Sequence, residues 1–336
     1  MITTRSSSPP SISVVFVSYD SAKTIGTAIH SVERYLPGAE VIVVDNGSTD
    51  QTCSIIRDTN STLLLEGHGN IGFGAGVNLG ARAATGDLLF VLNPDAAIVH
   101  ANLERLSDLA RLSPIGIRGC LQRDEHRSRY LKYYEWGWRR ELCWLIVQWF
   151  LVPREMNLHR PSSRLRKSRR WISGAAFVVG RGEFLDIGGF DEDIFMYCED
   201  VDLSRRYRDR DAVLGTTDAI EVTHEGQGSA QGGHEQIQGW ALLSFLEVVA
   251  KWSGPKDAER AASATLRLLN VISSVARCAS RLPLIGQRAA AKARSAATVR
   301  ASLLESAATP PRAGVYPRAR ASVTAAAQTS EDARAQ

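Results

Sequence analysis

The chain has 336 residues, of which 44% are hydrophobic and 23% are charged, as in a soluble globular protein with one large or two modest domains. Its net charge of +4 is too small for a protein that binds nucleic acid over its whole surface, so we expect no nucleic-acid partner. The five cysteines form no CxxC pair, which argues against a zinc knuckle and for a reducing compartment, so we expect a cytoplasmic protein. The sequence has no run of about 18 apolar residues, so we expect no spanning helix. The N-terminal residues MITTRSSSPPS lack the apolar segment of a signal peptide, so we expect none.

Short apolar segments alternate with helical patterns between residues 12 and 112. After a disordered lead-in over 1–11, the expected strands are 12–17, 40–44, 62–65 and 88–92. Helices are expected over 21–35, up to about 58, and from the glycine-rich stretch 70–80 to about 85. This alternation is typical of βαβ units, so the sequence predicts an α/β fold with a mostly parallel sheet flanked by helices.

Polar residues follow three of the expected strands: Ser18-Tyr19, Asp45-Asn46 and Asn93-Pro94-Asp95. Pro94 has no N–H for a sheet ladder, so the strand 88–92 should end before it. The carboxyl ends of parallel strands share one edge, which is where open α/β sheets bind ligands. A carboxylate there suits a divalent cation that bridges two phosphates, although Asn and Asp are also common in plain β-turns. Three polar strand ends on one edge favour a nucleotide-type site.

The glycine-rich stretch 70–80 does not match a dinucleotide-binding fingerprint. Its glycines are Gly72, Gly74 and Gly76, position 79 is Leu, and the stretch follows the third strand rather than the first. A dinucleotide-dependent dehydrogenase is therefore a poor interpretation.

The segment 121–170, which follows a possible strand at 115–120, is an aromatic and basic insertion. Residues 142–152 are apolar apart from Gln148 and follow two arginines, which is consistent with a helix lying in a membrane interface. A helix packed on the core or a loop over the active site would fit as well. The basic run 160–170 would attract anionic lipid or phosphate, or it is a solvated loop.

The stretch 190–208, FDEDIFMYCEDVDLSRRYR, is rich in carboxylates. It follows an expected strand at 171–180 and a short helix at 181–187. Glu199 and Asp200 should form the first turn of a helix over 200–208, where negative charge favours the helix dipole. One of these carboxylates could act as a base towards a hydroxyl, and simple helix capping is the alternative.

Two short strands between 211 and 222 should lead to His224. Histidine is the commonest metal ligand in proteins, although a histidine just past a strand is usually a satisfied turn residue. Residues 236–284 should contain one or two amphipathic helices. The Ala/Arg-rich tail 285–336 is expected to be disordered from about residue 307.

In their order, these segments resemble the inverting family 2 glycosyltransferases with a GT-A fold, and most of all their bacterial rhamnosyltransferase-type members. The resemblance covers roughly residues 12–229 and predicts a catalytic domain over 12–235. It rests on VVFVSYDSAKTI, VIVVDNGSTDQT, NIGFGAGVNLG, DLLFVLNPDA, ISGAAFVVGRGEFLDIGGFDEDIFMYCEDVDLSRR and HEGQGS. Val77, where Asn is common, and Cys198, where an aromatic or apolar residue is common, depart from the family pattern.

The resemblance implies a nucleotide-sugar donor on the carboxyl edge of the sheet. Asp95 and His224 would hold Mg²⁺ or Mn²⁺, and Asp200, beside Glu199, would be the general base. The residues implied to contact the donor are Ser18 and Tyr19 at the nucleotide, Asp45 at the base, Asn93 at the ribose or sugar, and Asn46 and Asn78 nearby.

The resemblance also implies transfer, with inversion, to a hydroxyl of a glycan or lipid-linked glycan in cell-envelope polysaccharide synthesis. The Asn-Pro-Asp form favours dTDP-rhamnose as donor, with UDP- and GDP-sugars as alternatives. Peripheral contact with the anionic inner face of the membrane is expected.

Two other functions are compatible with a sheet of this kind. A nucleotidyltransferase would need a basic glycine-rich loop where the chain reads SYDSAKTIG, and a catalytically inactive nucleotide-sugar sensor would not need Asp95, Glu199, Asp200 and His224 together.

Overall fold

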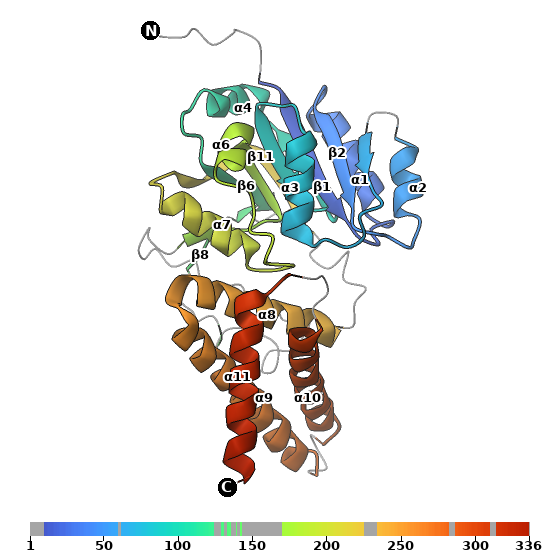
Figure 1. Cartoon of the computed structure of the whole chain (residues 1–336). Coiled ribbons are helices and arrows are strands. Elements are labelled where there is room, and N and C mark those ends of the chain that lie inside the picture. Colours follow the sequence, from blue (N-terminus) through green and yellow to red (C-terminus); the bar gives the residue numbers. More distant parts are fainter. Residues whose placement is uncertain are drawn as a thin grey trace. The chain divides into compact units, whose positions relative to one another are not determined.

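The computed structural model describes residues 10–59, 62–123, 129–130, 133–135, 139, 142, 170–224, 234–281, 286–309 and 314–335 (Figure 1). These residues form two compact units. The first draws on 1–134, 166–191 and 203–229, and the second on 135–165, 192–202 and 230–336. The expectations for the lead-in, for most of the insertion 121–170 and for the residues just after His224 fall outside the described residues.

The first unit begins with the βαβ pattern that the sequence predicts. Four parallel strands form one half of the sheet, and the strand 88–92 ends before Pro94 as expected. The elements are β1 (Ile12–Ser18), α1 (Ile25–Tyr35), β2 (Glu40–Asp45), α2 (Thr52–Arg57), β3 (Thr62–Leu65), α3 (Phe73–Ala83) and β4 (Leu88–Leu92). Every residue of β4 is buried, because strands in the middle of a sheet are covered on both faces.

The glycine-rich stretch serves the packing of α3 on the sheet. A Cβ at Gly76 would come 2.9 Å from Val17, and a Cβ at Gly80 would come 2.5 Å from Val15. Only glycine allows α3 to lie this close to β1. This packing explains Gly76 and Gly80 without a dinucleotide.

The first four strands are parallel, as expected, and the second half of the sheet is mixed. The strand order is β3-β2-β1-β4-β10-β6-β11-β5, and β7 pairs with β6. β10 runs antiparallel to β4 and β6, and β11 runs parallel to β6 but antiparallel to β5. The strands are β5 (Ala96–Ala101), β6 (Ile117–Arg123), β7 (Arg129–Tyr130), β10 (Ala176–Gly180) and β11 (Leu214–His224).

Two details of this half were not foreseen. β5 begins directly after Asp95, so the chain turns at Asn93-Pro94-Asp95 from one strand into another. β11 is one long strand rather than two, and its pairing with β6 shifts register between Thr217 and Glu221. The unit is completed by α4 (Leu103–Ala110), α6 (Arg181–Asp186) and the small sheet of β8 (Tyr133–Glu135) and β9 (Arg170–Ile172).

The second unit is helical. It contains α8 (His234–Ser253), α9 (Pro255–Ala279), α10 (Gly286–Ala308) and α11 (Pro317–Ala335), and α7 (Glu199–Arg208) begins in it. The tail differs from the expected disorder, because α11 buries Ala319 and Val323 in the core of this unit, and Tyr316, just before α11, is buried there too. None of the helices in the described part of the chain has the length and hydropathy needed to cross a bilayer.

Candidate functional site at the carboxyl edge of the sheet

Asp45, at the end of β2, organises the loop that follows it. Its carboxylate is buried and accepts four hydrogen bonds, from Ser18 Oγ at 2.9 Å, Gly47 N at 3.1 Å, Ser48 N at 2.9 Å and Ser48 Oγ at 2.5 Å. A carboxylate has about four lone-pair positions, so this one is fully used inside the protein. The structure thus brings Ser18 and Asp45 together as predicted, with the carboxylate bonded to the loop itself.

Asn46 is a buried amide with one free acceptor. Its Nδ2 donates to the carbonyl of Gly72 at 3.1 Å, and its backbone N–H donates to the carbonyl of Ser18 at 2.8 Å. Among the described residues its Oδ1 has no hydrogen-bond partner, although only 4% of the residue is exposed. A buried acceptor without a partner is costly, so a ligand donor here would be favourable. Tyr19, half-buried, follows Ser18 at the same edge.

Two carboxylates that the sequence analysis did not single out connect the loops after β1 and β2. Asp20, in the left-handed region with φ 47°, accepts from the backbone N–H of Thr49 at 2.7 Å. Asp50 accepts from Ala22 N at 3.1 Å and from Thr52 N at 3.0 Å. Partial burial raises the pKa of Asp50, but the hydrogen bonds from Thr52 and Ala22 outweigh it and lower the pKa. Asp20 and Asp50, in the loops after β1 and β2, were the sequence signal from which this connection could have been predicted.

Asp95 and His224 meet at the end of β4. The antiparallel register of β5 and β11 pairs His224 with Ala96, which places the histidine beside the turn. His224 Nε2 lies 3.1 Å from Asp95 Oδ1 and 3.3 Å from Asn93 Nδ2. Both side chains are largely buried, at 11% and 6% exposed. The structure therefore brings together three residues that are up to 131 positions apart in sequence.

This pair has a separation that suits one divalent cation. Two cis ligands at about 2.1 Å from an octahedral ion lie about 3.0 Å apart, close to the observed 3.1 Å. Carboxylate oxygen and neutral imidazole are both ligands of Mn²⁺, and carboxylate also suits Mg²⁺. Within the described ranges no group of three or more His, Cys, Asp or Glu side chains converges.

The surroundings of Asn78 differ from those expected of a residue that contacts the nucleotide-sugar donor. Its Nδ2 donates to the carbonyl of Phe190 at 2.9 Å, and its Oδ1 accepts from the N–H of Phe190 at 2.8 Å. It also fills the space where Gly189, at φ 64°, would carry a Cβ, 2.2 Å away. The buried amide thereby fixes the chain at the Gly188-Gly189-Phe190 turn.

Glu199 and Asp200 belong to the second unit, at the start of α7. Glu199 is 6% exposed, and its Oε2 has no hydrogen-bond partner in the described part of the chain. Burial, and then the neighbouring Asp200 charge, raise the pKa of Glu199 from 4.5 to about 8. Asp200 Oδ1 accepts from Val201 N at 2.8 Å. Two adjacent carboxylates with unequal environments are the usual basis of separate acid and base roles.

The backbone before Glu199 is strained. Tyr197 and Cys198 are consecutive residues with φ of 66° and 63°, a region that costs residues other than glycine about 1 kcal/mol or more each. Such strain persists only where the surroundings impose it, and it is common at functional sites. Apart from the unusual Cys198, no sequence pattern indicated this strain.

The surroundings that hold this segment come from the tail. The N–H of Tyr316 donates to the carbonyl of Asp193 at 2.8 Å, and Ser244 Oγ, which donates to the carbonyl of Met196, lies 3.0 Å from the Tyr316 hydroxyl. Glu247 on α8 accepts from Arg318 N at 2.9 Å and Ala319 N at 2.7 Å at the start of α11. These contacts lie within one unit, and composition alone did not indicate them.

We expect Glu199→Gln to remove a pH-dependent loss of stability. In the wild-type chain the raised pKa means that the neutral carboxyl contributes stability fully below pH 4.5, and this contribution is lost as the pH rises to about 8. The amide keeps the shape and stays neutral. Melting temperatures measured from pH 4 to 9 should therefore diverge, with the variant falling less. Parallel curves for the two proteins would contradict the buried neutral state of Glu199.

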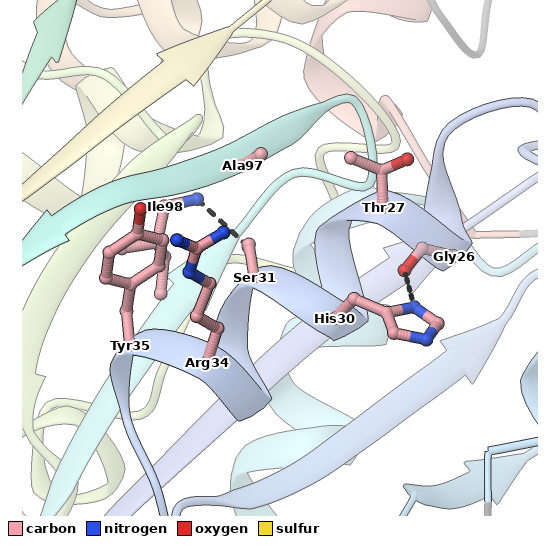
Figure 2. Close-up of a pocket in the computed structure, with 8 residues that line it drawn as sticks. All are labelled: Gly26, Thr27, His30, Ser31, Arg34, Tyr35, Ala97 and Ile98. Atoms are coloured by element: carbon pink, nitrogen blue, oxygen red, sulfur yellow. Dashed lines mark hydrogen bonds between the residues drawn. The ribbon is translucent and has the colours of Figure 1, made fainter.

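A separate open pocket lies between α1 and β5 in the first unit (Figure 2). It measures about 570 Å³, and His30, Arg34 and Tyr35 face it from α1. Ser31 Oγ accepts from the N–H of Ile98 at 3.0 Å, so a helix side chain satisfies a donor on the β5 edge. None of the predicted site residues lines this pocket, and we assign it no ligand.

Comparison with known proteins gives one family and consistent relatives. Residues 13–143 match Glycosyl transferase family 2. The chain is 35% identical, over 188 residues, to an N-acetylglucosaminyl-diphospho-decaprenol L-rhamnosyltransferase of Mycobacterium tuberculosis (strain CDC 1551 / Oshkosh), a match covering 49% of this chain and 60% of the relative. It is 25% identical over 219 residues to the rhamnosyltransferase WbbL of Escherichia coli (strain K12), covering 59% of this chain and 81% of that one.

The fold has solved counterparts. The crystal structure of GalNAc-T7 with UDP, GalNAc and Mn²⁺ is similar with a TM-score of 0.51 and 17% identity, over 74% of this chain and 49% of that one. The mixed sheet with flanking helices is thus that of the GT-A glycosyltransferases, as the sequence predicted.

Proposed function

We propose that the chain, whose residues 13–143 match Glycosyl transferase family 2, transfers rhamnose from dTDP-rhamnose, with inversion, to a hydroxyl of a lipid-linked glycan in cell-envelope polysaccharide synthesis. The names of the mycobacterial and E. coli relatives support the sugar, and the mycobacterial name supports a lipid-linked acceptor. The nucleotide rests on the Asn-Pro-Asp turn and on the resemblance. The sensor and nucleotidyltransferase alternatives gain no support from the comparisons.

The observation that carries the proposal is the Asp95–His224 pair at the end of β4, 3.1 Å apart and largely buried. In the proposal these two side chains hold Mg²⁺ or Mn²⁺, and Asn93 lies beside them towards the ribose or the sugar. A divalent cation bound there would neutralise negative charge on the leaving diphosphate. The Mn²⁺ in the GalNAc-T7 structure supports a divalent metal.

The nucleotide is proposed to lie against the ends of β1 and β2. Ser18 and Tyr19 border it, and the buried Oδ1 of Asn46 offers an acceptor for a nucleobase N–H. Because the Asp45 carboxylate already accepts four hydrogen bonds within the protein, we propose that it holds the loop 46–48 in place. Asn78 would likewise position the Gly188-Gly189-Phe190 turn.

Asp200 is proposed as the general base. It removes the proton from the acceptor hydroxyl, whose oxygen attacks the anomeric carbon on the face opposite the diphosphate. The carbon–oxygen bond to the diphosphate breaks as the new glycosidic bond forms. One displacement of this kind inverts the anomeric centre and needs no covalent enzyme intermediate. Burial raises the pKa of Glu199, so this neighbour of Asp200 is proposed to stay protonated and not to act as the base.

The test is thermal-shift binding against a panel of nucleotide sugars, with Mn²⁺ and then with EDTA. We expect dTDP-rhamnose to raise the melting temperature only when metal is present, because the metal would hold the diphosphate of the donor. A ligand that binds the native state, at 100 times its Kd, stabilises the protein by about 2.7 kcal/mol. Asp95→Asn and His224→Ala should lose the metal-dependent part, whereas Asp108→Asn, an exposed carboxylate on α4, should keep it. If no donor stabilises the wild-type chain with metal present, the proposed donor site is wrong.

A further inference from the structure

The outward face of α9 carries an exposed apolar stripe. Leu268, Val271 and Val275 are 37%, 56% and 62% exposed. Their spacing of three and four residues places them on one face of the helix. Among the described residues of α8 to α11, they are the large hydrophobic side chains that stay exposed, while the opposite face of α9 is buried through Ala262, Leu266 and Leu269 in the core of the second unit. The stripe is therefore not needed for the packing of its own unit.

The same face becomes basic towards the start of α9. A groove of about 480 Å³ lies there, lined by Lys256, Glu259, Arg260, Ser263, Ala264 and Arg267. Arg260 is paired with Asp257 at 3.1 Å. Lys256 and Arg267 are exposed and form no ion pair within the described residues. Glu259, also exposed, lines the same groove, so Lys256 and Arg267 leave it with a net positive charge. Such a groove beside an apolar stripe can accept a phosphate group while the stripe contacts hydrocarbon.

The charge of the surrounding sequence is one-sided. From residue 261 to residue 304 the chain has no Asp or Glu, but it has seven basic residues, at 267, 277, 281, 288, 292, 294 and 300. This segment includes most of α9 and α10, which pack side by side. On the face itself, a second copy would bring the exposed Lys256 and Arg267 of both copies together, whereas an anionic lipid surface complements them.

We propose that the outward face of α9, formed by Lys256 and Arg267 together with Leu268, Val271 and Val275, docks on a membrane surface of anionic lipid. The apolar side chains enter the boundary between headgroups and acyl chains, and the cations pair with lipid phosphates. The proposed function explains only why such docking would be useful, since the protein would reach a lipid-linked acceptor from the membrane surface. The docking itself needs no donor and no turnover.

The test is flotation of the full chain with vesicles of phosphatidylcholine alone and with phosphatidylglycerol added. We expect binding to the anionic vesicles that weakens with salt. A cation near an anionic surface contributes about 1 kcal/mol, or about fivefold in partitioning, so Lys256→Gln/Arg267→Gln should bind about 25-fold more weakly. Val271→Ser/Val275→Ser should lose on the order of tenfold through lost apolar burial.

The matched control is Arg111→Gln/Leu112→Ser, which changes an exposed cation and an exposed leucine in the first unit and should float like the wild type. Metal-dependent donor binding, measured in every variant, reports folding and separates this proposal from the donor site. Absence of flotation by the wild type, or equal flotation of all variants, would overturn the proposal. So would a wild-type dimer that the α9 variants convert to monomer without change in flotation, because the face would then bind a second copy.

Discussion

Asp200→Asn is expected to abolish turnover while metal-dependent donor binding survives. General-base catalysis contributes about 10² to 10⁴ in rate, and an amide of the same shape cannot accept the proton. The loss should fall on kcat, since the donor contacts proposed for Ser18, Asn46 and Asp95 lie in the first unit and do not involve this carboxylate. The loss of kcat is measured as sugar transfer at a saturating donor concentration. The retained donor binding is measured by thermal shift on the same protein.

The control is Asp209→Asn, which makes the same chemical change just beyond the end of α7, where the carboxylate is 55% exposed and lies 3.7 Å from Arg205. It should keep wild-type turnover. Robust turnover by Asp200→Asn would remove Asp200 from the base role and point to Glu199 instead. A loss of donor binding together with turnover would show that the substitution damages the fold rather than the chemistry.

The sequence was most informative where local pattern decides structure. The apolar run 88–92 is short and bounded by turn residues, which favours a buried strand, and Pro94 should end it, so the position of Asp95 could be predicted. The approach of His224 to Asp95 depends on the register of β5 and β11, which no local pattern contains. It was available only through the resemblance, which carries tertiary information from other chains.

The sequence was least informative where one residue type can serve two purposes. Asp45 ends β2 and Asn78 lies on α3, and both are polar residues of a kind that binds ligands, yet their side chains are hydrogen-bonded to Ser48 and Phe190. Sequence pattern does not tell a residue that binds a ligand from one that holds the loop around it. Hydrogen-bond geometry does, because the capacity of each group is limited.

The tail shows a second limit. An Ala/Arg-rich segment with prolines lacks large hydrophobic residues, so composition indicates disorder. Alanines, however, allow helices to pack closely, and Val315, Tyr316 and Val323 supply enough apolar area to bury α11 among α8 and α9. The decisive contact is polar: Glu247, fully buried on α8, accepts the free N–H groups at the start of α11.

Glu247→Ala is therefore expected to reduce both the stability of the second unit and turnover. It leaves the N–H groups of Arg318 and Ala319 without an acceptor and removes a negative charge from a helix N-terminus, at a cost of about 3 kcal/mol. Release of the start of α11 also frees Tyr316, whose N–H holds the carbonyl of Asp193 in the segment leading to Glu199 and Asp200. Urea unfolding should show the loss of stability, and kcat should fall with donor binding unchanged.

Glu247→Gln separates the charge from the hydrogen bonds, because its amide oxygen still accepts from the backbone of α11. It should retain most of the stability and most of the turnover, and Asp257→Ala, which removes a carboxylate from the first turn of α9, should leave turnover unaltered. If Glu247→Ala lowers stability but leaves kcat intact, the tail supports the helical unit without positioning the catalytic carboxylates. If kcat falls in step with loosening of the segment 193–199, measured by hydrogen exchange, α11 acts on the reaction through the backbone that carries Asp200.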